Sequence, residues 1–355
     1  MSIAPKFLFV PVSSDEGIGE YMRSKIIADE IMRRWPAAQI DFVLNRYAPY
    51  SQQCPYRTHL VDDTPTKKVK EVNQLVTELQ PDIVIFDAAG RKAQLKHANR
   101  QGAKVIFISQ HRRKRARGMK VERALVTDSH WVVQPEFVIG DLTAFEKFKL
   151  RMIDRPQPIY TGSVFTEPDP QQQQALLKHY QLQANDYVLF SAGSGGHKIN
   201  GSLAADLWAK TAQTTYQQLG IACVVVFGPN YPKPLPTIPG VIAIAELDSQ
   251  AFIHLLGGAK AALLSGGDTL LQAIALKTPT LAAAVSKDQP SRIKKCQQAG
   301  VIVTADNNHP AMSLALSELL QPKRLAELKQ HLDDASLTNG LTICLAEVER
   351  LLNCD

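Results

Sequence analysis

Cysteine is scarce in this sequence, with five residues in 355, and no two of them stand in a C-x-x-C spacing. Disulfide scaffolds and cysteine-based zinc sites are therefore excluded, and we expect reduced thiols and a cytoplasmic location. Long apolar runs are also missing, because Lys260, Asp268 and Lys277 interrupt the most apolar region. Since a membrane span needs about 18 consecutive apolar residues, none is expected, and we expect no signal peptide at the N-terminus.

Positive charge is concentrated in the first half of the chain. The net charge is +6, and residues 1–160 carry 26 Lys and Arg against 18 Asp and Glu. The remaining residues carry 14 against 16. A basic half beside a nearly neutral half points to an anionic partner for the first half, or to a solvated basic surface.

Short apolar runs alternate with helical patterns along the whole chain. Expected strands of the first half are residues 7–12, 40–44, 83–86, 104–108 and 131–133, with helices at 20–34 and 66–79. Expected strands of the second half are residues 187–190, 222–227, 240–244, 261–264, 280–284 and 301–303. This order is typical of an α/β fold, so we expect two Rossmann-like, doubly wound domains.

A proline-rich passage at residues 155–170 interrupts the alternation and predicts a linker near Gly162. We expect domains at residues 1–162 and 163–338, and a C-terminal helix within 339–355 that packs back on the first domain. Ligands of open parallel sheets bind at the carboxyl ends of the strands. The chemistry is therefore expected on strand-end loops, in a cleft between two facing sheets.

Gly17 and Gly19 lie in the loop after the first expected strand. They either bring backbone N–H groups to a ligand at a helix N-terminus or only form a tight turn. The loop lacks the third glycine of the dinucleotide fingerprint. Asn45 also stands where that fingerprint has an acidic residue, so NAD binding is not expected.

The loop after the strand at 187–190 is richer in glycine. It contains Gly193, Ser194, Gly195, Gly196 and His197. Such a loop can cradle an anion, and the histidine either contacts phosphate or faces solvent. Because Lys198 is not followed by Ser or Thr, the loop is not a Walker A motif and ATP hydrolysis is not indicated.

Two more polar loops follow expected strands of the second half. In the first, Gly267 precedes Asp268 and Thr269, which either cap the next helix or belong to a binding site. The second spans residues 286–292 and contains Asp288 and Gln289. We expect all these loops to lie on one side of the sheet.

The order Gly-Gly-Asp-Thr-x-x-Gln-Ala at 266–273, followed by Pro279 and by Lys-Asp-Gln at 287–289, resembles nucleotide-sugar glycosyltransferases of the GT-B fold. The similarity is to the group that contains the bacterial peptidoglycan N-acetylglucosaminyltransferase and the nucleotide-sugar hydrolase of pseudaminic acid synthesis. Gly17-Ile-Gly-Glu-Tyr-Met-Arg is similar to the hydrolase's Gly-Ile-Gly-His-x-Met-Arg. The resemblance covers the architecture of nearly the whole chain.

The resemblance implies a donor site in the second domain, with a UDP-sugar as co-substrate and no other cofactor or metal. Ser194 and its neighbouring glycines would approach the diphosphate, and Thr269 with Gly267 and Asp268 would bind phosphate at a helix N-terminus.

The remaining donor contacts are implied in the same way. Gln272 stands where the family usually has a Glu that bonds the ribose, which weakens this match. The segment from Leu247 to Phe252 matches the one that reads the base, and Asp288 with Gln289 matches the residues that reach the sugar.

Glu20 stands where relatives carry a histidine that acts on the acceptor. A carboxylate there can take a proton from the acceptor hydroxyl, while helix N-termini stabilise the leaving diphosphate. Asp15 in the same loop is the alternative base. Glu20 is also a residue type that the helix dipole favours in a first turn.

A basic run follows the strand at 104–108. It contains Arg112, Arg113, Lys114, Arg115 and Arg117. The run suits an anionic acceptor or an anionic membrane surface, or is a solvated loop. Without interleaved aromatics or a nucleic-acid motif, nucleic acid is not expected. No Phe or Tyr stripe marks a lipid-facing patch, so membrane contact, at the inner face, rests on charge alone.

We therefore expect an enzyme, a metal-independent glycosyltransferase that moves a sugar from a nucleoside diphosphate to an acceptor hydroxyl. Inversion at the sugar is implied by the resemblance. The alternatives are a nucleotide-sugar hydrolase, and a non-catalytic subunit that binds a nucleotide sugar or tethers a partner.

Overall fold

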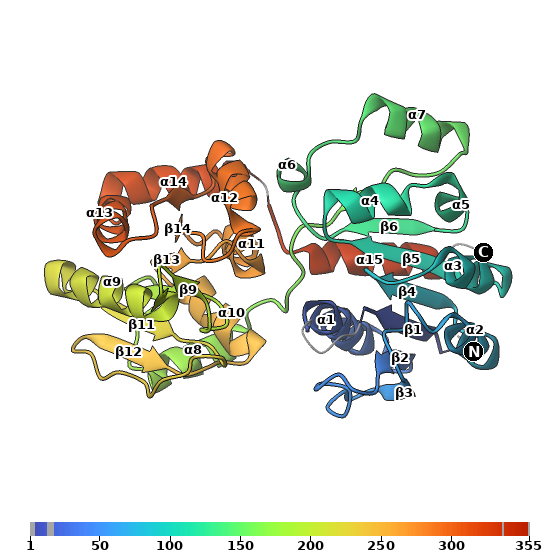
Figure 1. Cartoon of the computed structure of the whole chain (residues 1–355), viewed down its shortest axis with the longest axis horizontal. Helices are drawn as coiled ribbons and strands as arrows, with labels where there is room; N and C mark the ends of the chain where they lie inside the picture. The colour runs from blue at the N-terminus through green and yellow to red at the C-terminus, as the bar shows by residue number, and fades with distance from the viewer. Residues whose placement is uncertain (1–3, 13–17, 336, 354–355) are drawn as a thin grey trace. The chain divides into compact units, whose positions relative to one another are not determined.

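The computed structural model describes residues 4–12, 18–335 and 337–353. The chain forms two compact units (Figure 1). Unit 1 comprises residues 1–165 together with 340–355, and unit 2 comprises residues 166–339. Among the described helices, none is both long and apolar enough to cross a bilayer.

Unit 1 is a parallel sheet with helices on both faces. Its strand order is β3-β2-β1-β4-β5-β6-β7. The strands are β1 (Lys6–Pro11), β2 (Gln39–Asn45), β3 (Arg57–Val61), β4 (Ile83–Asp87), β5 (Lys104–Ser109), β6 (Ser129–Val132) and β7 (Ile159–Tyr160). The helices are α1 (Gly19–Arg34), α2 (Val69–Leu79), α3 (Lys92–Arg100), α4 (Arg112–Gly118), α5 (Val121–Ala124), α6 (Glu136–Ile139), α7 (Ala144–Met152) and α15 (Gly340–Leu352).

The period of two in β1 divides the core of unit 1 into two layers. Phe7 and Phe9 pack with α1 and α15 on one face of the sheet. Leu8 and Val10 pack with α2 and α3 on the other face. Alternate side chains of a strand point to opposite faces, so one apolar run contributes to both layers.

Unit 2 is a second parallel sheet, with the order β12-β11-β8-β13-β14-β15. Its strands are β8 (Tyr187–Ser191), β11 (Ala222–Val226), β12 (Val241–Ile244), β13 (Ala261–Leu264), β14 (Thr280–Ala282) and β15 (Val303–Thr304), and β9 (Lys198–Ile199) pairs with β10 (Ser202–Leu203) as a separate antiparallel hairpin. Its helices are α8 (Pro170–His179), α9 (Ala204–Leu219), α10 (Ser249–Gly258), α11 (Asp268–Ala275), α12 (Gln289–Gln298), α13 (His309–Leu319) and α14 (Pro322–Asp334).

The predicted α/β class and the two doubly wound sheets are confirmed. The sequence pattern missed β3 and β7, which lie at the two edges of the sheet of unit 1. Edge strands are covered on fewer sides, so they need no continuous apolar run. Most residues of β3 and both residues of β7 are accordingly only half-buried.

The units divide at slightly different residues from those expected. The first boundary lies between Phe165 and Thr166 rather than at Gly162, because Phe165 is buried and Val164 belongs to the core of unit 1. The second boundary lies between Asn339 and Gly340. From there α15 supplies Leu345 and other side chains to the core of unit 1.

Candidate functional site

The strand order of unit 2 has a switch point between β8 and β13. The chain winds from β8 outward through β11 to β12, and from β13 outward through β14 to β15. The loops after β8 and β13 therefore leave the sheet in opposite directions at the carboxyl ends of the strands, which is where open α/β sheets bind their ligands. The two strand ends are joined there, since the Ser265 backbone N–H donates to the Ser191 carbonyl at 3.2 Å.

The loop after β8 is held in a conformation that requires glycine. Gly193 and Gly195 have φ of +95° and +92°, where a side chain is strained. A Cβ at Gly195 would also lie 2.4 Å from the carbonyl oxygen of Phe227. The Asn230 N–H donates to the Ser194 carbonyl at 2.8 Å, so this loop packs against the loop after β11.

Helix α9 does not follow this loop directly. The hairpin β9–β10 intervenes before α9 begins at Ala204. Gly196 is exposed, and Ser194 and His197 are half-buried. The Ala204 N–H donates to the His197 carbonyl at 2.9 Å, so the N-terminus of α9 is bound to the loop itself.

The loop after β13 leads straight into α11. Its N-cap is Gly267, so neither Asp268 nor Thr269 is the N-cap residue, and both lie in the first turn. Thr269 is half-buried, whereas Asp268 is exposed and pairs with Arg292 at 3.3 Å. The half-buried Gln272 follows one turn later on the same helix. The first-turn N–H groups of a helix attract anions.

Gln289 holds two strand-end loops together. Its side chain is buried, and its Oε1 accepts from the Gly266 N–H at 3.1 Å and the Val285 N–H at 2.8 Å. A Cβ on Gly266 would lie 2.8 Å from the Cβ of Gln289, so only glycine permits this approach. The amide oxygen is thereby committed to positioning the loops.

Asp288 remains exposed beside Gln289. Ser286 Oγ donates to its carboxylate at 2.6 Å. This hydrogen bond, with smaller effects of Arg292 and His197, holds the pKa of Asp288 below its usual range. Because His197 acts on Asp288, the loop after β14 lies near the loop after β8.

The segment from Leu247 to Phe252 begins α10. Asp248 caps the helix, its Oδ1 accepting from the Ala251 N–H at 2.8 Å. Leu247 and Phe252 are half-buried and pack against the core of unit 2. The segment is thus fixed at both ends by apolar packing.

In unit 1, the predicted loop of Asp15, Gly17 and Gly19 is only partly described. Asp15 and Gly17 lie outside the described residues, and Gly19 begins α1. Glu20 is half-buried in the first turn of α1. Its charge acts on Asp87, His111 and Lys114, so Glu20 lies near the ends of β4 and β5.

A buried ion pair, which the sequence analysis missed, lies next to Glu20 at the end of β4. Arg23, one turn after Glu20, donates to both carboxylate oxygens of Asp87 at 2.9 and 2.6 Å. Asp87 is fully buried, and burial raises its pKa against the opposing effect of Arg23. The pair ties α1 to β4. The available signal was an acidic residue at the end of an apolar strand, followed by Ala-Ala-Gly90.

The basic run is a helix, α4, and not the loop allowed for in the sequence analysis. Arg115 is no ligand contact, because it is fully buried and donates to Tyr160 Oη at 2.5 Å and to the Asp141 carbonyl at 3.1 Å. A helix turns its residues to different sides, so one member of a charged run packs inward. Arg112, Arg113 and Arg117 remain exposed.

Lys114 and Arg117 line a pocket of about 420 Å³ at the ends of β4 and β5. Its wall also includes Arg91, Lys120 and the buried Arg123, which donates to the Gly90 carbonyl at 2.8 Å. Burial, and to a smaller degree nearby cations, lower the pKa of Lys114 and of Arg123. The pocket is therefore suited to an anion. Among the described residues, no group of three or more His, Cys, Asp or Glu side chains is arranged to hold a metal ion.

The chain thus combines two doubly wound sheets with glycine-bearing loops at the switch point of the second. We compared this arrangement with known proteins. No protein-family model and no curated protein matches the sequence. Among solved structures, CalG4, the calicheamicin glycosyltransferase, matches with a TM-score of 0.65 at 14% identity, over 99% of both chains. MurG from Acinetobacter baumannii matches with a TM-score of 0.64 at 11% identity, over 98% of this chain and 99% of its own.

The UDP-GlcNAc 2-epimerase from Neisseria meningitidis, bound to UDP-GlcNAc, matches with a TM-score of 0.60 at 14% identity, over 97% of this chain and 100% of its own. These likenesses show that the chain has the GT-B fold of nucleotide-sugar glycosyltransferases over nearly its full length. The resemblance inferred from the sequence motifs is thereby confirmed at the level of fold.

Proposed function

We propose that the protein is a glycosyltransferase that moves a sugar from a nucleoside diphosphate, with UDP as the expected nucleotide, to a hydroxyl of an anionic acceptor. The observation that carries this proposal is the pair of glycine-bearing loops at the switch point of unit 2. Backbone N–H groups of Ser194 to Gly196 and the first turn of α11 can offer donors to a diphosphate, whereas the Gly193 N–H donates to Ser191 Oγ at 3.3 Å. The match of the whole chain to the GT-B fold supports it.

The proposed reaction is a direct displacement at the anomeric carbon, with inversion and without a metal ion. The acceptor oxygen forms a bond to this carbon as the bond to the diphosphate oxygen breaks, and the electron pair of that bond stays on the diphosphate. Glu20 takes the acceptor proton, with Asp15 as the alternative base. Backbone N–H groups and Thr269 stabilise the charge that develops on the diphosphate.

The anionic character of the acceptor rests on the pocket beside α4. Its cations include Lys114, Arg117 and Arg123, while its carboxylate Glu122 is paired with Lys92. An acceptor that bears phosphate or carboxylate would offset this positive potential.

Donor binding is tested by thermal shift with UDP, GDP, dTDP, ADP and CMP. One diphosphate at about a hundred times its Kd is expected to stabilise the protein by about 2.7 kcal/mol, which is several degrees in Tm. The shift should disappear in Ser194→Ala/Thr269→Ala and persist in the control Ser317→Ala on α13. No shift with any nucleotide would contradict the donor site.

The base is tested by Glu20→Gln with the donor so identified. Donor binding should stay unchanged, while sugar transfer falls about a hundredfold or more because the acceptor proton has no receiver. Glu30→Gln is the matched control, since Glu30 lies on the same helix and pairs with Arg33. Loss of transfer in Asp15→Asn instead would move the role to Asp15.

Product analysis separates transfer from the other reactions that a nucleotide-sugar protein can perform. Free sugar formed without any acceptor would favour the hydrolase. A changed sugar still attached to the nucleotide would favour an epimerase, a reaction named for one structure of the same fold. Donor binding without turnover, unaffected by Glu20→Gln, would favour a non-catalytic subunit.

A further inference from the structure

Helix α7 of unit 1 turns an apolar face to solvent. Phe145, Phe148 and Met152 are 71%, 50% and 68% exposed, whereas Leu150 is buried. Positions three and four apart share one side of a helix, so the three exposed side chains form a single stripe opposite the packed side. The sequence analysis expected no aromatic stripe, and α7 corrects it. Contiguous exposed apolar surface of this kind marks an interaction site.

The charge that accompanies this stripe is positive. Lys147 and Arg151 of α7 are exposed, and Lys149 is half-buried. The one acidic residue of the helix, Glu146, is turned to the protein, where its carboxylate accepts from the Thr143 N–H at 2.9 Å and lies 3.7 Å from Arg115. The outward side of α7 therefore combines apolar groups with cations.

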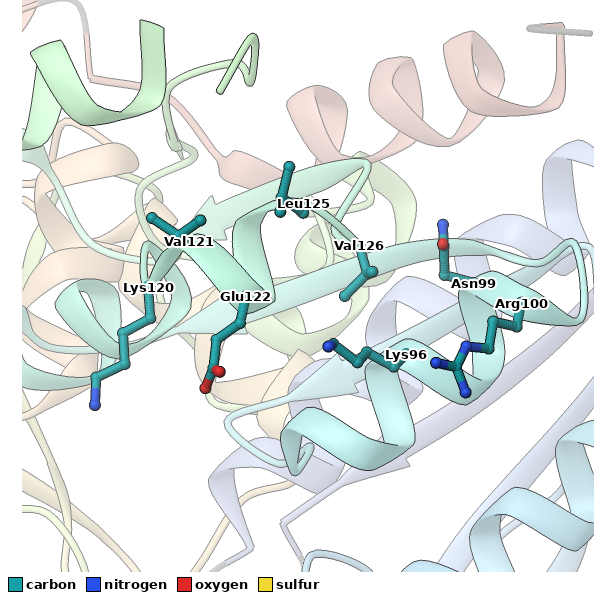
Figure 2. A pocket seen from close by; sticks show the side chains of 8 residues that line it. All are labelled: Lys96, Asn99, Arg100, Lys120, Val121, Glu122, Leu125 and Val126. Carbon is teal, nitrogen blue, oxygen red and sulfur yellow. The ribbon is translucent and has the colours of Figure 1, made fainter. Parts of the chain in front are cut away.

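Helix α5 packs beside α7 and also exposes apolar side chains. It shares a small core with α7, formed by Met119, Ala124, Leu142 and Leu150. Val121 and Leu125 are 42% and 43% exposed. They line a pocket of about 600 Å³ with Lys96, Arg100, Lys120 and Glu122, whose carboxylate pairs with Lys92 (Figure 2). We call Val121, Leu125, Phe145, Phe148 and Met152, with the cations around them, the α5–α7 face.

We propose that the α5–α7 face docks on the surface of an anionic lipid bilayer. Aromatic side chains would enter the boundary between headgroups and acyl chains, and the Lys and Arg side chains would pair with lipid phosphates. Nine residues are too few for α7 to span a bilayer, so the helix would lie along its surface. A second copy of the chain is a poorer occupant, because a symmetric contact would set these cations against one another.

The test is co-sedimentation of the full chain with vesicles of phosphatidylcholine alone, and with vesicles in which about a third of the lipid is phosphatidylglycerol. The wild type should bind the anionic vesicles preferentially. Phe145→Ser/Phe148→Ser should weaken partitioning about tenfold or more, and Lys147→Gln/Arg151→Gln about fivefold per charge. The control is Leu314→Ser on α13, equally apolar and 63% exposed, which should bind like the wild type.

Both phenylalanines are exposed, so the double variant should melt at the temperature of the wild type. Absence of wild-type binding to anionic vesicles would overturn the docking proposal, as would equal binding of the phenylalanine variant. A wild-type dimer that this variant dissociates, without vesicle binding, would show the face to be an interface between copies. The donor thermal shift is independent of these outcomes, so failure here leaves the proposed function intact.

Discussion

Arg115 and Lys114 are neighbours in one basic run, yet they have different roles. Arg115 is enclosed by carbonyl groups and the Tyr160 hydroxyl, while the half-buried Lys114 lies between β4 and the basic pocket. Burial of a cation is costly unless hydrogen bonds replace water, which the carbonyls of residues 140 and 141 provide for Arg115. Residue type alone does not show which of these two cations is fully buried.

His130 is another buried basic side chain of unit 1, and burial changes its pKa. It is buried between Phe107 and Ser109, with its Nε2 3.0 Å from Ser109 Oγ. Burial, and to a lesser extent Arg115, lower the pKa of His130 from its usual value to about 3.

The free energy of unfolding should therefore depend on pH through His130. Between about pH 6.5 and pH 3 the unfolded chain binds a proton at this residue and the folded chain does not, so stability falls as the pH falls. The slope is about 1.4 kcal/mol per pH unit. Urea unfolding of His130→Gln against the wild type measures it, with His179→Gln on the surface of α8 as control. Parallel pH profiles for His130→Gln and the wild type would contradict this assignment.

At the scale of elements, the candidate donor site depends on the approach of two loops. A Cβ on Gly228 would lie 2.4 Å from the Gly193 carbonyl oxygen and 2.5 Å from the Ser194 carbonyl carbon. The loop after β11 therefore packs directly against the loop after β8, and the conformation of each loop depends on the other.

Gly228→Ala should destabilise the protein and abolish the nucleotide thermal shift, because either loop must move to admit the methyl group. Gly201→Ala is the matched control. Both glycines have positive φ, +94° and +85°, but a Cβ on Gly201 has no atom within 4 Å. The control should carry only the strain of the backbone, about 1–3 kcal/mol, and keep the thermal shift. Equal loss of the shift in both variants would assign the effect to strain alone.

At the scale of the whole molecule, the chain crosses between the units twice. The two crossings are adjacent in unit 1, where the Gly340 N–H donates to the Ser163 carbonyl at 2.8 Å. A Cβ on Gly340 would lie 2.5 Å from the Thr161 carbonyl oxygen, so glycine is needed where the chain returns. Helix α15 then completes the layer that α1 begins.

Unit 1 should therefore lose stability when its last helix is altered. Leu345→Ala empties a buried position and should cost about 2–4 kcal/mol in the free energy of unfolding. Leu352→Ala, on the same helix but only half-buried, should cost clearly less. Urea unfolding followed by circular dichroism compares the two. Equal midpoints would mean that α15 does not stabilise unit 1.

The sequence alone was sufficient for the α/β class, for most strands and for the glycine-bearing loops at their ends. These features depend on apolar residues that recur with a period of two or 3.6, and on glycine and proline where helices and strands end. Both signals come from residues that are close together in the chain. The motif at 266–273 likewise predicted the fold that the solved structures confirm.

Only the tertiary structure decided which polar groups work together. The Arg23–Asp87 pair joins residues 64 positions apart, and Gln289 binds backbone 23 positions away. It also decided that Arg115 is buried and that Phe145 and Phe148 are exposed. Burial and pairing depend on which surfaces meet once the strands are ordered in a sheet, and no local pattern of residues contains that order.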